Sequence, residues 1–559
     1  MASTSAATAE TRGQRRLDSG GGGFVLRRVQ IWNISRSGLP RFGFRGSIPA
    51  RHPAGKETLK SRGRGRGEGA APRTPDSLCY NPAAREPDRD PSQGSQNLPA
   101  SVSAGSLPEV PMTFPMRCVA ALAGILAVTT ASSRAQEIRF NVVPYRLDNG
   151  LKILTLEDHS VPAMSYYTVF QVGSRNERPG RTGISHLFEH MMFNGSKKYG
   201  PGVFDRTLES KGGASNAFTT EDMTVYYESF PSEALDAVVD LEADRMAALA
   251  LTEESLISER EVVKEERRLR TDNDVEGALF ELLEATAYLA HPYQWPVVGW
   301  MPDLDAITVR DCEEYFRVHY APNNATIILV GDFKPDRAIG LIGKAYGSIP
   351  LQPAAPQVVR DEPAQQGERR AVLKRAAQLP AVVFAYHVPA TSSEDVFALD
   401  LLQIILGQGE SALLNRKLVY EKELATRVRA ENIWRSDPSL FVIYAEAKPG
   451  VTAEALEAAL GAEVEALGQK EVIDASLQKA KNVRTTNQVK ALKTNSGKAE
   501  ELGLFEVYFG GYARLFTVLK SYDAVTKADL QRVAARYLRL DNRTVVTLLP
   551  TEAGGEVRP

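Results

Sequence analysis

The sequence predicts an α+β fold made of two homologous sandwich domains, each with a mixed or antiparallel sheet covered by helices. Two observations carry this prediction. Runs rich in β-branched residues alternate with long amphipathic helical stretches, and several short patterns recur 218 residues apart. With 43% hydrophobic and 24% charged residues, the composition is that of a globular protein and excludes a collagen, a coiled coil or a wholly disordered chain.

The repeat defines the expected domain organisation. Three pairs of segments share the offset: 162–170 with 380–388, 308–311 with 526–529, and 324–329 with 542–547. We therefore expect a first domain at 136–349, a second domain at 371–552 and a short tail at 553–559. Residues 350–370 are rich in Pro, Ala and Gln and are typical of a linker.

The first 111 residues do not resemble a domain. They are crowded with Gly, Ser, Pro and Arg and show no sustained apolar period, so they cannot bury enough surface to offset their chain entropy. A basic arm or a transit peptide is one interpretation. We expect instead a disordered extension or a segment wrongly translated from upstream of the true start. Residues 136–559 hold 48 Lys and Arg against 60 Asp and Glu, and such an acidic body argues against nucleic-acid binding.

Residues 112–135 have the plan of a secretory signal peptide. Arg117 precedes the apolar run 118–130, and small residues at 133 and 135 suit cleavage before Gln136. The run is too short for a comfortable permanent membrane anchor; a buried core helix is the alternative. We expect an exported protein, in the bacterial periplasm, with no stable membrane anchor after cleavage. Translation would then start at position 112 or 116.

The strongest chemical signal is the pattern His186-Leu-Phe-Glu189-His190. Residues i and i+4 of a helix share a face, so both imidazoles can bind one zinc ion with Glu189 beside them. This is the inverted zinc-peptidase order, H-x-x-E-H. Two histidines without a metal are the alternative interpretation. Asn194-Gly195 is expected to end the helix.

A hydrolytic zinc needs a third protein ligand and an open position. We expect that ligand on a helix over 253–270, capped by Thr252. Glu259 and Glu266 fall on the apolar stripe of this helix, where carboxylates are costly unless a cation meets them. This selects Glu266 over its neighbour Glu265. The expected stripe consists of Leu256, Val262, Val263 and Leu269; the expected outer face consists of Glu261, Lys264, Glu265, Arg267 and Arg268.

From about residue 143 to 549 the chain resembles the pitrilysin/insulinase family of zinc metallopeptidases, in the two-domain class that includes the mitochondrial processing peptidase. Beside the zinc motif, the segments that carry the resemblance are 147–151 (LDNGL), 173–177 (GSRNE), 213–219 (GASNAFT), 259–266 (EREVVKEE), 291–293 (HPY) and 320–325 (YAPNNA).

The resemblance implies a role for each matching residue. His186, His190 and Glu266 would hold one zinc per chain. Glu189 would be the catalytic base. Glu259 would be a second-shell acid, and Asn216-Ala217 would belong to an edge strand that pairs with a peptide substrate. The two domains would form half of a clamshell chamber that cleaves unstructured peptides or small unfolded polypeptides.

The second domain lacks a copy of the site, because no histidine follows His387. Active members of the family also use an Arg and a Tyr from a domain without metal. The matching positions hold Val419 and Thr426. We therefore expect a heterodimer with a zinc-less homologous subunit that supplies these two groups. The alternatives are a presequence-processing peptidase subunit and a non-catalytic assembly subunit of the same family.

Overall fold

The computed structural model describes residues 139–356, 358, 361–468 and 474–551, all of which belong to one compact unit. The expected extension at 1–111, the expected signal peptide at 112–135 and the expected tail at 553–559 lie outside the described residues.

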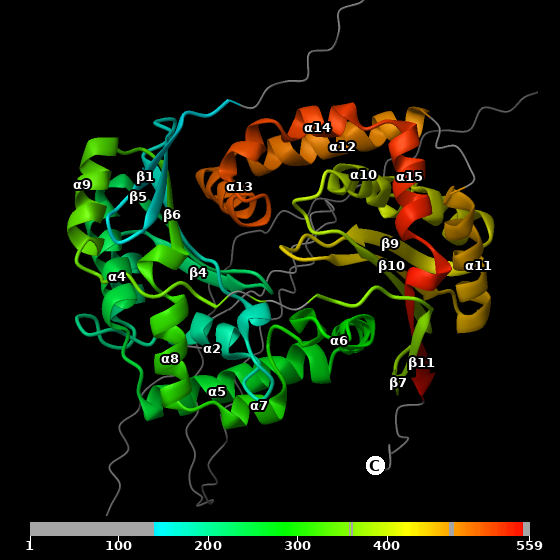
Figure 1. The fold of residues 1–559 in the computed structure, drawn as a ribbon, viewed down its shortest axis with the longest axis horizontal. Coiled ribbons are helices and arrows are strands. Elements are labelled where there is room, and N and C mark those ends of the chain that lie inside the picture. Colours follow the sequence, from blue (N-terminus) through cyan, green and yellow to red (C-terminus); the bar gives the residue numbers. More distant parts are fainter. Residues whose placement is uncertain (1–138, 357, 359–360, 469–473, 552–559) are drawn as a thin grey trace, which may run out of the picture. The chain divides into compact units, whose positions relative to one another are not determined.

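The first half of the described chain is built on a six-stranded sheet with the strand order β1-β2-β6-β3-β5-β4 (Figure 1). Neighbouring strands are antiparallel except β2 and β6, which are parallel. Its strands are β1 (Val142–Arg146), β2 (Lys152–Glu157), β3 (Ala163–Phe170), β4 (Ala214–Thr219), β5 (Thr224–Pro231) and β6 (Ala325–Gly331). Because β4 pairs with β5 alone among the described strands, it forms one edge of this sheet.

The second half is built on a five-stranded sheet with the order β7-β11-β8-β10-β9. Its strands are β7 (Arg369–Ala376), β8 (Ala381–Val388), β9 (Ala425–Asn432), β10 (Ser439–Ala447) and β11 (Arg543–Thr551). The order repeats that of β2, β6, β3, β5 and β4, and again only the first pair, β7 with β11, is parallel. The α+β prediction is therefore confirmed, and the two sheets share one topology.

Local contacts repeat as well. Thr308 and Thr526 each cap a helix and form a capping box with the Asp three residues later. The side-chain amides of Asn324 and Asn542 each donate, at 2.8 Å, to a carbonyl oxygen at the end of that helix. The 218-residue offset therefore reflects equivalent backbone positions.

Helices surround the two sheets. Those of the first half are α2 (Ile184–Met191), α3 (Val203–Ser210), α4 (Leu235–Ala248), α5 (Glu253–Arg267), α6 (Val275–Ala287), α7 (Met301–Ala306), α8 (Val309–His319) and α9 (Pro335–Tyr346). Those of the second half are α10 (Asp395–Gly407), α11 (Ala453–Glu465), α12 (Asp474–Ala491), α13 (Asn495–Tyr508), α14 (Val518–Ala524) and α15 (Lys527–Tyr537). Two π-helical turns interrupt this pattern, η3 (Arg268–Asp272) and η6 (Asn415–Glu421).

One face of each sheet is covered by a helix from the opposite half. Helix α6 packs Leu279 and Leu283 on the second sheet. Helix α13 packs on β3 and β6 of the first sheet, where a Cβ atom on Gly503 would lie 3.1 Å from Val169 and 3.3 Å from Ile328. Each sheet is apolar on both faces and therefore needs two covering layers. The halves are thus joined by packing as well as by the chain.

A buried charged cluster also joins the halves. Arg435, between β9 and β10, is 1% exposed and contacts Glu221, which follows β4. Its guanidinium also lies 2.6 Å from Glu284 of α6 and donates to the hydroxyl of Tyr288 at 3.3 Å. The ring of Tyr293 lies 4.5 Å away. A buried cation needs such partners, because an unpaired charge in the interior is costly.

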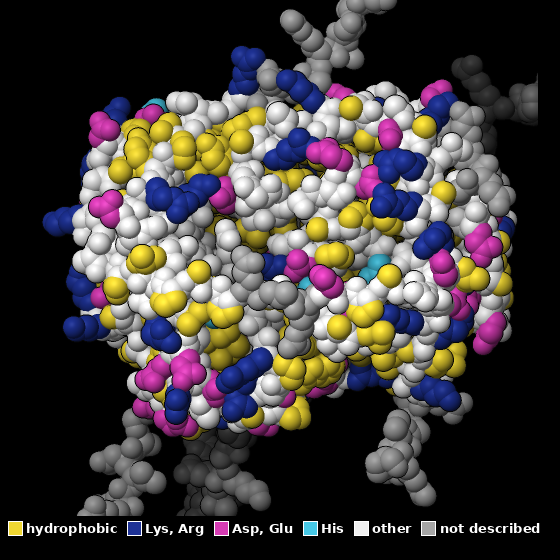
Figure 2. Space-filling model, viewed as in Figure 1, with side chains coloured by type: hydrophobic (Ala, Val, Ile, Leu, Met, Phe, Trp, Pro, Cys, Tyr) yellow, Lys and Arg dark blue, Asp and Glu magenta, His cyan; other side chains and the backbone are white. Residues whose placement is uncertain are grey.

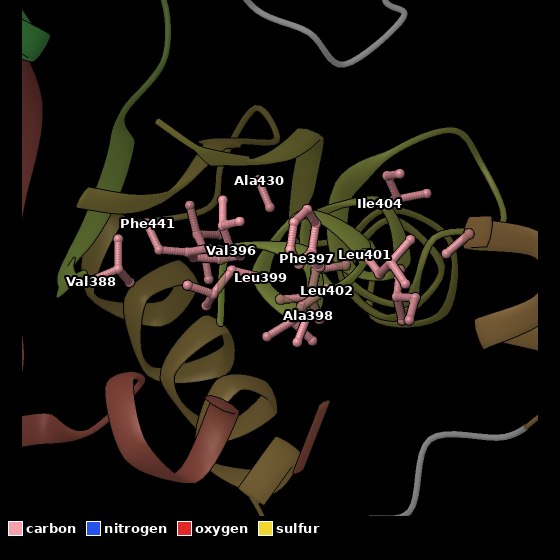
Figure 3. Packing of buried hydrophobic residues seen from close by; sticks show 14 of the residues in the cluster. Val388, Val396, Phe397, Ala398, Leu399, Leu401, Leu402, Ile404, Ala430 and Phe441 are labelled. Atoms are coloured by element: carbon pink, nitrogen blue, oxygen red, sulfur yellow. The ribbon is translucent and has the colours of Figure 1, made fainter. Parts of the chain in front are cut away.

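Helix α10 occupies the centre of the second half. All thirteen of its residues are buried, which is typical of a helix that is apolar on all sides. Figure 3 shows Val396, Phe397, Leu399 and Leu402 of this helix within one buried cluster that also includes Ala430 and Phe441 of the sheet. This helix follows β8 as α2 follows β3, and it holds no histidine.

The surface carries charges of both signs. On the face drawn in Figure 2, Lys and Arg side chains are scattered among Asp and Glu side chains. Within the described part of the chain, no helix combines the length and the apolar composition needed to cross a membrane.

Candidate metal centre

The zinc motif lies on helix α2, whose residues are all buried. The helix begins after Gly183, whose φ of 89° and tight contact with the carbonyl of Val298 admit no side chain. The carboxyl group of Glu177 accepts hydrogen bonds from the backbone N–H groups of Gly183 (2.7 Å) and Ser185 (2.8 Å). This carboxyl group therefore satisfies N–H groups at the start of the helix that lack helical partners.

The end of α2 differs from the expectation. Asn194-Gly195 was the expected cap, but the helix ends at Met191 with Met192 as its C-cap. Gly195 adopts a φ of 107° in the following turn. The glycine with positive φ therefore lies three residues beyond the C-cap.

Three ligand atoms converge between α2 and α5, which pack against each other (Figure 1). Glu266 Oε2 lies 3.7 Å from His186 Nε2 and 3.4 Å from His190 Nε2. A tetrahedral zinc with bonds of about 2.0–2.1 Å keeps its ligands about 3.4 Å apart. The two Nε2 atoms are buried without a hydrogen-bond partner among the described residues. Unpartnered buried nitrogens are rare, so this donor set fits a zinc ion.

Glu259 contacts the far side of one imidazole. Its Oε2 lies 3.4 Å from His190 Nδ1. Such a carboxylate fixes the tautomer and the orientation of a metal-binding ring. Glu265, by contrast, has a side chain that is 59% exposed and pairs with Arg268. The structure thus brings Glu259 and Glu266 to the site and leaves Glu265 outside it.

The predicted apolar stripe of α5 was partly wrong. Leu256 and Val263 are fully buried, whereas Val262 and Leu269 are exposed. Successive helical residues differ by about 100°, so Val262 and Val263 cannot face the same core. Leu269 lies in the π-helical turn η3, where the helical period changes.

Arg267 also departs from the prediction, which placed it on the outer face. It is buried and forms a bidentate pair with Glu281 at 2.8 and 3.1 Å. It also donates to the carbonyl oxygen of Gly299 at 2.9 Å. The turn that begins at residue 268 is therefore anchored to α6.

Glu189 lies beside the three ligands with its two oxygens in different surroundings. Oε2 accepts a hydrogen bond from Thr219 Oγ1 at 2.7 Å and lies 4.0 Å from His186 Nε2. Oε1 is buried and has no hydrogen-bond partner among the described residues. One oxygen is thus fixed by the protein, and the other remains available to a water molecule or a substrate.

Burial and neighbouring charges set the pKa values of the metal-free site. Burial lowers the pKa of His186 to about 3 and raises the pKa of Glu189 to about 7. Burial also acts to lower the pKa of His190, but its close contacts with the carboxylates of Glu259 and Glu266 outweigh this effect and raise the pKa to about 9. The site therefore favours one imidazolium when no metal is bound.

Comparisons with known proteins identify the family of this chain. Residues 152–299 match the family described as Insulinase (Peptidase family M16), and residues 306–484 match the family described as Peptidase M16 inactive domain. The chain is 34% identical over 450 residues to the zinc protease PqqE of Helicobacter pylori, covering 78% of this chain and 99% of that protein.

The chain belongs to the insulinase (peptidase M16) family. It is also 26% identical to a probable mitochondrial-processing peptidase subunit beta of Arabidopsis thaliana, over 74% of this chain and 78% of that protein. A crystal structure of a protease from H. pylori superposes with a TM-score of 0.71, at 33% identity, over 74% of this chain and all of that one. The periplasmic protease PqqL from Escherichia coli shares the fold, with a TM-score of 0.62, at 20% identity, over 74% of this chain and 48% of that one.

The edge strand of this M16 chain passes next to the site. Asn216 and Ala217 lie on β4, and Thr219, at the end of the same strand, donates to Glu189. Ala217 is buried, and its backbone N–H donates to the side chain of Asn216. An edge strand can pair with an extended peptide.

The structure places the two positions at which an Arg and a Tyr were expected. Val419 lies in the π-helical turn η6. Thr426 is the second residue of β9 and donates to Glu446 at 2.7 Å. The next residue, Arg427, donates to the hydroxyl of Tyr444 at 3.1 Å, but its guanidinium also pairs with Glu276 and Glu446. Among the described residues, His186, His190 and Glu266 are the one group of three that meets the geometry of a metal site.

Sequence reasoning missed two residues of the centre. Thr219 lies within a quoted motif, but its contact with Glu189 joins segments 30 residues apart. Arg270 contacts Glu266 from the π-helical turn. Arg270 lies four residues after Glu266, and this helical spacing is the sequence signal that could have indicated the pair.

Proposed function

We propose that this chain is the zinc-carrying subunit of an exported endopeptidase that cleaves unstructured peptides or small unfolded polypeptides. The observation that supports this most is the convergence of His186, His190 and Glu266 beside a buried carboxylate with one unpartnered oxygen. The relatives named zinc proteases support the same chemistry. We further propose that the peptidase domain spans 136–349 and that 371–552 is a homologous domain without a metal, joined to it by 350–370.

Each residue has a distinct task in this proposal. His186, His190 and Glu266 hold the ion, and Glu259 orients His190. When bound, zinc would supply an acidified water molecule and a positive charge for the carbonyl oxygen of the peptide. Glu189 accepts a proton at Oε1 while Thr219 holds Oε2. The same carboxyl group then donates the proton to the leaving amine. The backbone of β4 aligns the peptide, with Asn216 and Ala217 on the pairing strand.

Substitutions can test the role of the proposed base separately from the role of the proposed zinc ligands. Glu189→Gln removes only the proton acceptor and is expected to keep one zinc per chain while losing nearly all peptide cleavage. Glu266→Ala is expected to lose zinc, and Glu265→Ala is the matched control that keeps it. Metal content measured on the purified chain, together with cleavage of an unstructured peptide, checks all three. Full zinc content in Glu266→Ala would contradict the ligand assignment.

We also propose that the chain works as part of a heterodimer. Val419 has no polar group, and the side chain of Thr426 is too short to replace a phenol. A zinc-less homologous subunit would supply the Arg and the Tyr. The relative named subunit beta supports an assembly of this kind. As to cellular location, the structural relative PqqL, which is named a periplasmic protease, supports the proposed export of this chain.

A further inference from the structure

The π-helical turn η3 after α5 is clamped by contacts on several sides. Arg375 of β7 donates to the carbonyl oxygens of Thr271 (3.2 Å), Asp272 and Asp274 (3.3 Å). On α6, a Cβ atom at Gly277 would lie 2.0 Å from the carbonyl oxygen of Arg270, so this backbone approach requires glycine. Turns of this type are frequent at functional sites. The clamp therefore fixes the backbone of Arg270.

The turn directs one arginine at the metal centre and another away from it. Arg270 Nε lies 3.0 Å from Glu266 Oε1, while Glu266 Oε2 lies between the two imidazoles. The two oxygens of Glu266 thus have separate neighbours, and Oε1 meets Arg270 in an ion pair but accepts no hydrogen bond from the described residues. Arg268 instead pairs with the exposed Glu265 at 2.9 Å. The side chain of Arg268 is 42% exposed and that of Arg270 is 39% exposed, so the two arginines differ in their contacts and not in their exposure.

We propose that Arg270 is a positioning residue for the metal centre. It holds Oε1 of Glu266 so that Oε2 alone is presented to the ion, which leaves a coordination position for water. A carboxylate without this restraint can rotate or bind a metal through both oxygens. This inference rests on the proposed function, because it takes Glu266 as a zinc ligand.

The direction of the change in zinc affinity distinguishes a positioning role of Arg270 from a simple effect of its charge. A guanidinium near a cation repels it, so loss of the charge alone would tighten zinc binding. Loss of a positioning contact to a ligand instead weakens metal binding, by about 10- to 100-fold. We therefore expect Arg270→Met to bind zinc about 10- to 100-fold more weakly than the unmodified chain. Arg268→Met removes the same charge two residues away and is expected to leave the affinity unchanged.

The experiment measures zinc affinity on the full metal-free chain by competition with a coloured chelator. Cobalt(II) serves as a second probe, because its visible absorption is expected to change in Arg270→Met and not in Arg268→Met. Circular dichroism of the metal-free variants checks the fold. Should Arg270→Met fail to fold, Arg270→Gln, which retains a hydrogen-bond donor without the charge, is measured in its place, with an expected affinity below that of the unmodified chain.

The outcomes are distinguishable. Zinc binding by the variant as tight as, or tighter than, that of the unmodified chain would overturn the positioning role while leaving the zinc site intact. Failure of the unmodified chain itself to bind zinc would overturn the proposed function. Equal weakening in Arg268→Met would also contradict the proposal, because it would show a general effect of charge on this segment.

Discussion

Thr219 connects the expected substrate strand to the expected base. Its hydroxyl lies 2.7 Å from Glu189 Oε2, and it occupies the last position of β4. A hydrogen bond to a buried carboxylate contributes about 1.5–3 kcal/mol. Pairing of a peptide with β4 would therefore also restrict the side chain of Thr219, which orients Glu189.

We expect Thr219→Val to lower kcat about 10- to 100-fold, a loss typical when a residue that orients another group of a metal centre is removed, while zinc content stays at one per chain. The hydrogen bond from Thr219 lowers the pKa of Glu189, so its removal raises that pKa and moves the acidic limb of the rate profile to higher pH. Steady-state kinetics across pH checks both effects. Thr219→Ser should restore the rate. Thr155→Val, which removes a hydroxyl that donates to a backbone oxygen of β1, is the control.

His190 gives zinc binding a predictable dependence on pH. Without metal its pKa is about 9, because Glu259 and Glu266 outweigh the effect of burial. At pH 7 the ring is an imidazolium, and zinc must displace its proton. Zinc affinity should therefore rise as pH rises from 7 to 9, with about one proton released per ion.

Calorimetry in buffers of different ionisation enthalpy measures that proton release. Glu259→Gln removes one of the contacts that raise the pKa of His190, so the rise in affinity should shift to lower pH. Glu265→Gln changes an exposed carboxyl on the same helix and serves as the control. An affinity that does not vary with pH would contradict the assignment of His190.

At the scale of elements, α6 and α13 hold the two halves together, because each helix packs on the sheet of the opposite half. Each of these helices fills one face of the opposite sheet. On α13, Gly503 allows the backbone to approach Val169 and Ile328 of the first sheet. The packing there leaves no space for a larger side chain.

We expect Gly503→Leu to destabilise the protein by about 1–3 kcal/mol, because overpacking forces neighbouring side chains from their rotamers. Gly340 lies on the exposed side of α9 with open space around its Cα atom. Gly340→Leu should therefore be neutral or stabilising by about 0.5–1 kcal/mol, since leucine favours a helix more than glycine does. Thermal unfolding monitored by circular dichroism measures both variants. Equal stability of the two would show that the α13 contact is loose.

At the scale of the whole molecule, the proposed centre has three ligands and a base, but the resemblance implies that two donors are missing. Val419 and Thr426 lie where the resemblance places the Arg and Tyr of active members of the family. Arg427, which lies next to Thr426, is paired with Glu276 and Glu446. A second copy of the same chain would repeat this gap.

We therefore expect the chain alone to cleave an unstructured peptide weakly, and a zinc-less homologous subunit to raise turnover strongly. Peptide cleavage with and without the partner measures the effect. If the chain forms a homodimer, Val419→Arg together with Thr426→Tyr should increase its activity, whereas Val489→Arg on the exposed side of α12 should not. Full activity of the isolated chain would refute the need for a partner.

The sequence by itself determined the local part of this centre. His186, Glu189 and His190 fall within one helical turn, and Glu259 and Glu266 lie two turns apart, so helical geometry alone predicts which side chains share a face. The constant 218-residue offset likewise predicted two sheets of one topology. These inferences depend on spacing along the chain, which is a property of the sequence.

Only the tertiary structure decided the remaining contacts. The contact of Thr219 with Glu189 and the packing of α13 on the first sheet join segments that are distant in the sequence, which helical periodicity does not describe. Leu269 lies in a π-helical turn that follows α5, and Arg267, Arg375 and Gly277 hold this turn in place. Such a turn changes the residue period, so the exposure of Leu269 follows from packing against α6 and β7, whereas the pair of Arg270 with Glu266 keeps a helical spacing of four residues.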